Sequence, residues 1–327
     1  MSSIRTTGEL RLVSLLPSAT EMVCALGLTD QLLGITHCCD YPPEIRGKPL
    51  VVHGNIPVAD LSPREIDSAV SESLGRGESL YHVDVELLRE IAPTHILTQD
   101  LCQVCAPAGN EVTRVLNSLP HKPQVLWMSP HSIEQIEGNL LELAQATGRE
   151  VEAKHLIADG RNRLLEVAER VAKARHRPRV FCAEWMDPLF CAGHWVPEMV
   201  EIAGGTDLLG RKWTDSVRVS WDAVREAAPE VLVLMPCGYA SQGAQAQAGL
   251  LLKQPGWVAL PAVQQNRVFA VDGGYFNRPS PRVVDGTELL AHLLHPNLFA
   301  WNGKADAYVK IDCSAAPGVF GAAPSTR

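Results

Sequence analysis

The sequence predicts an α/β protein of two similar lobes, each built on a parallel-type central sheet. A phrase that runs from Glu-Met-Val through Gly and Thr-Asp to Leu-Leu-Gly occurs at 21–34 and again at 198–210. A second phrase, Arg-Glu-x-Ala-Pro before an apolar run, occurs at 89–97 and again at 225–234. Because both phrases recur in the same order, a duplicated lobe explains them better than chance likeness of two helix–strand passages. Two lobes predict a cleft between them that holds a small ligand.

Length and composition agree with two globular domains. The chain has 327 residues, of which 46% are hydrophobic and 20% are charged, which are values typical of a folded globular protein. The net charge of −8 argues against nucleic acid and against anionic membrane surfaces as partners. No apolar run approaches the ~20 residues that a membrane span needs.

The N-terminus and the cysteines predict a cytoplasmic location. The first ten residues are polar, and no basic start, long apolar segment and small-residue cleavage site follow in order. Nine scattered cysteines are typical of a reducing compartment. A start upstream would instead make the protein periplasmic.

The pattern in the first lobe alternates strands with helices, which predicts a parallel sheet. Ser18 and Glu21 fit a capping box at the start of the first helix, and Gly27 would end that helix. Prolines place 37–43 in a loop. We expect strands at 12–16, 32–35 and 96–98, and helices at about 20–26 and 83–91.

The remaining chain predicts a helical connection, a second lobe and a tail. Apolar residues at helical spacing cover 133–172, with Gly148 and Gly160 as candidate breaks. The second lobe opens with a strand at 179–182 and alternates as far as a strand at 268–271. The predicted boundaries are 1–130 for the first lobe, 131–177 for the linking helical segment, 178–300 for the second lobe and 301–327 for an extended, disordered tail.

Three stretches in the right order carry a resemblance to a known family. Residues 11–21 resemble the opening strand–loop–helix of the cobalamin and iron-siderophore substrate-binding proteins of ABC importers. Asp-Tyr-Pro-Pro at 40–43 and the aromatic-Phe-x-Arg-x-Ser-Pro-Arg stretch at 275–282 are similar to the cobalamin-binding member. The resemblance implies two α/β lobes joined by one long rigid helix, with the ligand held in the cleft. It also implies that an exported form has an ABC importer permease as its partner, with one docking acid in each lobe, near Glu111 and Glu201. The alternative is that both residues are ordinary exposed acids.

Loops after strand ends carry the candidate ligand residues. A corrinoid is a flat macrocycle with an amide rim, so it needs aromatic faces and a few placed donors and acceptors. Open α/β sheets present ligand sites in the loops after the carboxyl ends of their strands. The alternative is that several of the aromatic residues only fill cores. The candidates are Pro17, Ser18, Thr20, Asp40, Tyr41, Trp185, Phe190, Trp221, Tyr275 and Phe276.

A second cluster is rich in sulfur and imidazole. His37-Cys38-Cys39 and Cys102-x-x-Cys105 lie in two predicted loops of the first lobe. Three interpretations stay open: packing of small buried cysteines, contact with a corrinoid or its cobalt, and a separate metal or thiol-redox site. We name His37, Cys102 and Cys105 as candidate metal ligands, and we prefer His37 to His95, which adjoins a strand.

The chain has no recognisable catalytic motif. Gly-x-Ser-x-Gly, a Gly-rich phosphate loop and His-Glu-x-x-His do not occur. We therefore predict a non-enzyme that needs no cofactor and binds a cobalamin-like corrinoid for sequestration, hand-over or uptake. The alternatives are a zinc, iron or thiol-redox protein that uses the His and Cys loops, and a siderophore- or haem-binding protein.

Overall fold

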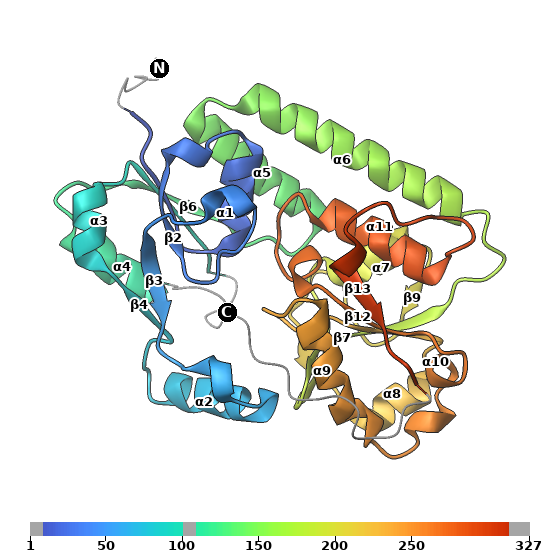
Figure 1. Ribbon diagram of the computed structural model, residues 1–327. Coiled ribbons are helices and arrows are strands. Elements are labelled where there is room, and N and C mark those ends of the chain that lie inside the picture. Colours follow the sequence, from blue (N-terminus) through green and yellow to red (C-terminus); the bar gives the residue numbers. More distant parts are fainter. Residues whose placement is uncertain (1–8, 101–108, 314–327) are drawn as a thin grey trace. The chain divides into compact units, whose positions relative to one another are not determined.

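The computed structural model describes residues 9–100 and 109–313, and it divides into two compact units (Figure 1). Each unit has its own sheet. The first unit comprises Met1–Ile56, Glu72–Ser129 and Asn139–Ala153, and the second comprises Pro57–Ser71, Pro130–Gly138 and Lys154–Arg327. The predicted α/β fold of two lobes is confirmed. The predicted linking segment does not form a separate body, because its residues divide between the units.

The first unit is built on a six-stranded sheet of order β4-β3-β2-β1-β5-β6. Its strands are parallel except β4, which is antiparallel to β3. The central strand reads Leu-Val-Ser and is buried on both faces, as helix-covered parallel sheets require. The strands are β1 (Leu12–Ser14), β2 (Leu32–Thr36), β3 (Leu50–Gly54), β4 (Tyr81–Val83), β5 (His95–Thr98) and β6 (Gln124–Trp127), and the α-helices that accompany them are α1 (Pro17–Ala25), α3 (Val85–Ile91) and α4 (Gly109–Ser118).

The second unit is built on a seven-stranded sheet of order β10-β8-β7-β11-β12-β13, with β9 paired to β7. Strands β7, β11, β12 and β9 run parallel, whereas β8, β10 and β13 are antiparallel to their neighbours. The strands are β7 (Arg179–Met186), β8 (Leu189–Cys191), β9 (Thr206–Asp207), β10 (Val217–Arg218), β11 (Val231–Leu234), β12 (Val268–Val271) and β13 (Tyr308–Lys310), and the α-helices between them are α7 (Val196–Ile202), α8 (Trp221–Ala227), α9 (Ser241–Leu252), α10 (Pro261–Gln264) and α11 (Val283–Leu294).

The repeated Arg-Glu-x-Ala-Pro phrase adopts the same local structure in both units. Helix α3 has Asp84 as its N-cap, and α8 has Ser220. Each helix ends at an alanine with positive φ, Ala92 at 48° and Ala228 at 44°, and a proline follows that no longer continues the helix. A buried strand comes next in each unit, β5 or β11. The duplication read from the sequence therefore has a structural counterpart.

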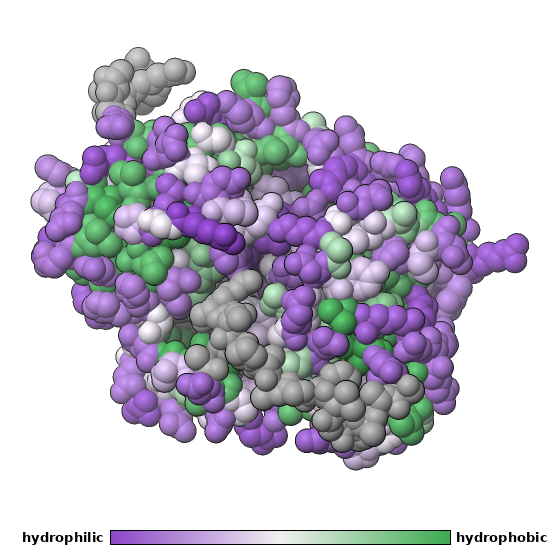
Figure 2. Space-filling view, in the orientation of Figure 1, coloured by the Kyte–Doolittle hydropathy of each residue, from purple (hydrophilic) through white to green (hydrophobic). Residues whose placement is uncertain are grey.

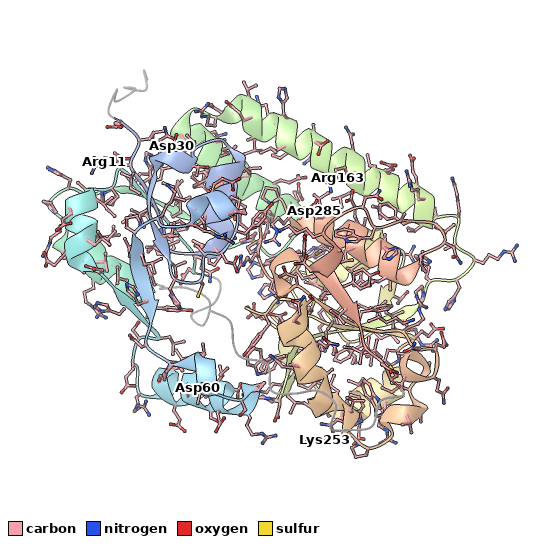
Figure 3. The ribbon with its side chains drawn as sticks, in the orientation of Figure 1. Arg11, Asp30, Asp60, Arg163, Lys253 and Asp285 are labelled. Atoms are coloured by element: carbon pink, nitrogen blue, oxygen red, sulfur yellow. The ribbon has the colours of Figure 1, made fainter. Side chains whose placement is uncertain are left out.

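The connection between the lobes consists of two helices rather than one long helix. Helix α5 (Ile133–Thr147) ends before Gly148, whose φ is +71°, and α6 (Glu150–Val171) follows. Gly160 causes no break. Within the second unit, α6 lies beside α11, and Arg163 of α6 donates to Asp285 and Glu288 (Figures 1 and 3).

Two local predictions are wrong. Helix α1 begins at Pro17 with Leu16 as its N-cap and no side-chain cap, because proline at the first helical position starts the helix earlier than the expected capping box. The tail expected to be disordered from 301 contains a short 3-10 helix at Ala305–Ala307 and β13, which pairs with β12. The second lobe therefore extends at least to Lys310, and residues 314–327 lie outside the described part.

The face of the molecule drawn in Figure 2 is mainly hydrophilic. Figure 2 shows polar side chains over most of the visible face, with apolar groups in separate patches. Among the helices of residues 9–100 and 109–313, none has the length and apolar character to cross a bilayer. The apolar side chains gather instead in the interiors of the two units.

Candidate ligand-binding loops

The loop after β2 holds an imidazole and two thiols at the carboxyl end of the first sheet. His37 Nδ1 lies 3.2 Å from the carbonyl oxygen of Val52, and its Nε2 lies 3.2 Å from Cys38 Sγ. Cys39 Sγ lies 3.1 Å from Thr20 Oγ1. Burial lowers the pKa of His37, against the hydrogen bond with Val52, which raises it. A mostly neutral imidazole beside a thiol can ligate a metal.

Of the predicted metal set, the structure describes only His37. Cys102 and Cys105 fall outside the described residues, so their distance from His37 is not established. His95 is buried in β5 and contacts Thr94, with 2.9 Å between its Nδ1 and the threonine hydroxyl, which is the structural role expected beside a strand. The metal site of the first unit stays a prediction.

The other first-unit candidates differ in accessibility. Ser18 is 3% exposed and Thr20 is fully buried in α1, so both lie inside the unit rather than on a surface that faces a ligand. Pro17, Asp40 and Tyr41 are half-buried and lie just after β1 and β2. These three retain the accessibility and position that ligand contact requires.

In the second unit, the turn between β7 and β8 gathers aromatic side chains. The indole of Trp185 lies 6.1 Å from the Tyr239 ring, measured between centroids. Its Nε1 donates to the carbonyl oxygens of Pro63 and Asp187, each at 3.2 Å. Phe190 pairs with Trp185 across the two strands and lies beneath the Arg218 guanidinium, 5.4 Å from ring centroid to Cζ. Trp185, Phe190 and Tyr239 are half-buried, which is typical of side chains that present one face to a ligand.

The first turns of α2 (Pro63–Gly75) are ion-paired to this turn. Arg64 donates to both carboxylate oxygens of Asp187, at 2.7 and 3.0 Å. Arg218 donates to both oxygens of Asp67, at 2.8 and 2.9 Å. The sequence analysis did not identify Arg64, Asp67, Arg218 or Tyr239. The one pattern that could have indicated an ion-pairing surface is the spacing of Arg64 and Asp67, which places them on one face of a helix.

Three of the aromatic candidates pack against other side chains instead. Trp221 stacks on Trp257 at 6.1 Å between centroids, and its Nε1 donates to Pro255 at 2.8 Å. Phe276 is fully buried and Tyr275 is 5% exposed. The Tyr275 ring packs edge-on against Trp301 and lies under Arg282. Packing partners therefore cover Tyr275 and Phe276 in this structure, whereas Trp221 is half-buried. Ligand contact by these three residues stays a prediction.

The two predicted docking acids have different outcomes. Glu201 is exposed at the end of α7 and forms an ion pair with Lys212. Glu111 lies in α4, but its side chain is outside the described set. Docking of either acid to a transporter stays a prediction.

One acid in the second unit is strongly perturbed. Asp207 in β9 is half-buried with its Oδ2 atom enclosed, and burial raises its pKa from 3.8 to about 6. Two hydrogen bonds to Oδ1, from the amides of Leu209 and Gly210, act in the opposite direction. The other oxygen, Oδ2, is buried without a hydrogen-bond partner, so loss of water outweighs the two bonds.

Comparison with known proteins agrees with this architecture. The family described as periplasmic binding protein matches residues 12–275. A vitamin B12-binding protein of Vibrio cholerae is 25% identical over 283 residues, which cover 85% of this chain and 86% of that protein. An uncharacterized ABC transporter substrate-binding lipoprotein of Bacillus subtilis is 23% identical over 295 residues, covering 88% and 81%.

A solved structure has the same fold. The periplasmic haem-binding protein RhuT from Roseiflexus sp. RS-1 superposes with a TM-score of 0.66 at 21% identity, covering 88% of this chain and 99% of that chain. At this identity the likeness concerns the fold alone. The family match, by contrast, spans most of the chain.

Proposed function

This chain belongs to the periplasmic binding protein family, and on that premise we propose that it binds a corrinoid of the cobalamin type without changing it chemically. The family binds small molecules and serves ABC importers. A vitamin B12-binding protein is among the relatives, whereas a haem-binding protein shares the fold. The bound molecule is a solute rather than a cofactor, and the proposed use is sequestration, hand-over or uptake.

The observation that carries the proposal is the half-buried aromatic set at the β7–β8 turn. Trp185, Phe190 and Tyr239 offer flat apolar faces close to one another. A macrocycle packs on such faces through apolar contact, and the polar groups around them orient its rim. In the first unit, Asp40 and Tyr41 carry acceptor and donor groups of the kind that amides bind.

The charges around this set favour a neutral ligand rim over an anionic one. Arg64 of α2 contacts the turn through Asp187, and Arg218 of β10 lies over Phe190. Each guanidinium already donates to both oxygens of one carboxylate. A haem brings two carboxylates, which would have to displace Asp187 and Asp67 to reach these guanidinium groups. The amide rim of a corrinoid requires no such exchange, since amides hydrogen-bond without a counter-ion.

Calorimetric titration tests the proposal. The ligands are cyanocobalamin, cobinamide, haem and a ferric siderophore, each added to the purified full chain. We expect the corrinoids to bind with Kd below roughly 10 μM, which corresponds to about −7 kcal/mol, and more tightly than haem. Absence of corrinoid binding below that limit, or tighter binding of haem or the siderophore, would contradict the proposal.

Variants locate the ligand contacts. Trp185→Leu removes a flat face and should weaken binding roughly tenfold. Trp221→Leu is the matched control, because that indole stacks on Trp257, and it should leave the affinity unchanged. Equal losses in both variants would indicate a general structural effect instead of a contact at the β7–β8 turn.

The thiol-based alternative rests on the close contact of His37 Nε2 with Cys38 Sγ. Metal analysis of protein purified without chelators separates the two functions. Stoichiometric zinc or iron that is lost in Cys102→Ser would favour the metal function, whereas metal-free protein that binds a corrinoid would exclude it.

A further inference from the structure

Three metal-ligating side chains from separate segments meet in the second unit. His131 precedes α5, His194 lies between β8 and α7, and Asp215 precedes β10. One ligand atom of each lies within 4.8 Å of the other two. Within residues 9–100 and 109–313, no other three His, Cys, Asp or Glu side chains are grouped in this way. The cluster has no role in the binding function proposed above.

The spacing of the three side chains suits a zinc-class ion. Nε2 of His194 lies 3.4 Å from Asp215 Oδ1, and Nε2 of His131 lies 3.9 Å from the same oxygen. Metal–ligand distances of ~2.0–2.2 Å in a tetrahedral site place ligand atoms roughly 3.3 Å apart. The two separations from Asp215 Oδ1 are close to this value, and the ligand nitrogens of the two imidazoles lie within 4.8 Å of each other. Two imidazoles and a carboxylate form a donor set that zinc commonly takes, with one position left open.

The backbone holds His194 against the segment that carries Asp215. His194 has a φ of +53°, a conformation that non-glycine residues rarely adopt. Its amide donates to the carbonyl of Thr214 at 2.6 Å, and its own carbonyl accepts from the amide of Trp213 at 2.8 Å. Next to it, Gly193 packs so closely that a β-carbon there would lie 2.5 Å from the Thr214 oxygen. Strain of this kind persists where the surroundings fix it and is frequent at functional sites.

His131 is fixed by the start of α5. Its amide donates to Gln135 Oε1 at 2.7 Å. Two residues later, the amide of Ile133 donates to Glu198 of α7 at 3.2 Å, which ties this segment to the helix that follows His194. Pre-positioned ligands of this kind lose little conformational entropy when an ion binds.

Exposure and charge also suit an ion that enters from solvent. The side chain of His194 is 16% exposed, that of His131 is 37% exposed and that of Asp215 is 75% exposed. Burial lowers the pKa of His194, and proximity to His131 acts in the same direction, against Asp215, which raises it. A neutral imidazole is the form that binds metal. The accessible carboxylate leaves a path to the metal position.

We propose that His131, His194 and Asp215 bind one divalent cation of the zinc class, with the remaining coordination position open to water or a solute donor atom. None of its three residues belongs to the aromatic set at the β7–β8 turn or to the first-unit thiols. It adds a metal-binding function to the second unit alone.

The test is a Zn²⁺ titration of the full chain, in competition with a chromophoric chelator and without any corrinoid. The variants are His131→Gln and Asp215→Asn, and the matched control is His155→Gln, an exposed histidine of α6. We expect one Zn²⁺ at this site, affinity reduced at least tenfold in each site variant, and unchanged affinity in the control. Zn²⁺ should raise Tm in the wild type and the control, but less in the site variants.

A second probe distinguishes this site from the cysteines. Co²⁺ bound by imidazole and carboxylate gives visible d–d absorption without the thiolate charge-transfer band that cysteine ligation produces. We expect this spectrum in the wild type and in Cys38→Ser, with its loss in His131→Gln. Loss of binding in Cys38→Ser, unaltered binding in both site variants, or no binding in the wild type would overturn the proposal. Circular dichroism of each variant confirms that it is folded.

Discussion

Replacement of Asp207 by asparagine should change how stability depends on pH. The pKa of this carboxyl is raised from 3.8 to about 6, because burial strips Oδ2 of water and leaves it without a partner. At ~1.4 kcal/mol per pKa unit, the difference amounts to about 3 kcal/mol. Well below pH 3.8, the group is protonated in both states and carries no penalty. As pH rises from 3.8 to about 6, the unfolded chain ionises while the folded chain stays protonated, so the free energy of unfolding falls by about 3 kcal/mol in all.

An asparagine side chain does not titrate, so the Asp207→Asn variant lacks this loss. Urea unfolding followed by tryptophan fluorescence, at intervals from about pH 4 to about pH 7.5, gives the free energy of unfolding at each pH. The difference between variant and wild type should grow by about 2.5 kcal/mol in favour of the variant over this range, because part of the loss has already occurred at about pH 4. Asp159→Asn, which replaces an exposed acid of α6, controls for the lost charge. Parallel curves for wild type and Asp207→Asn would refute the assignment of a buried, water-stripped carboxyl.

Three further predictions concern packing, backbone and ion pairs, each measured as a change in the free energy of unfolding. Trp221→Ala should lower it by about 2 kcal/mol through loss of a stacked indole, and no change would mean that the indole is not packed. Gly138→Ala in α5 should raise the free energy of unfolding by about 0.5–1 kcal/mol, whereas Gly148→Ala should lower it by about 1 kcal/mol. A β-carbon meets no neighbour at either position, but only Gly148 has positive φ. Equal effects of the two substitutions would contradict this reasoning. Arg163→Met should lower the free energy of unfolding by about 1 kcal/mol at low salt and by less at high salt, because two carboxylates of α11 lose their partner. An effect that does not depend on salt would count against these ion pairs.

The duplicated phrases predicted the lobes because they encode local structure. An N-cap, a helix, an αL alanine and a proline are adjacent in sequence, so Ala92 and Ala228 carry the same conformation wherever the helices pack. Strand positions were also predictable, because a strand is encoded by a local run of residues. The predicted strand at 268–271 coincides with β12. The two-helix connection was predicted in part: of the two candidate breaks, Gly148 separates α5 from α6, whereas α6 continues through Gly160.

The burial of several candidate site residues could not be predicted from the sequence, because burial depends on contacts far along the chain. Flanking glycines and prolines placed Tyr275 and Phe276 in a loop, but Trp301 and Arg282 cover the tyrosine and the phenylalanine is enclosed. Trp221 lies at the predicted helix start, but its indole stacks on that of Trp257. The cluster of His131, His194 and Asp215 has no sequence signature, since three loops bring it together.

The compartment and the transporter partner stay predictions. The nine cysteines are typical of a reducing compartment and favour a cytoplasmic protein. Fractionation of cells that express the native locus distinguishes the outcomes. We expect the protein in the cytoplasmic fraction with reduced thiols, and a shortened, disulfide-bonded form in the periplasm would contradict that prediction.

The central claim is that a member of this family binds a corrinoid through the aromatic set at the β7–β8 turn. The most direct measurement is calorimetric titration of wild type and Trp185→Leu with cobinamide, which retains the corrin ring and its amide rim. The account predicts binding below roughly 10 μM in the wild type and an affinity roughly tenfold weaker in the variant. Wild-type protein that fails to bind cobinamide, or a Trp185→Leu variant that binds it equally well, would contradict the account.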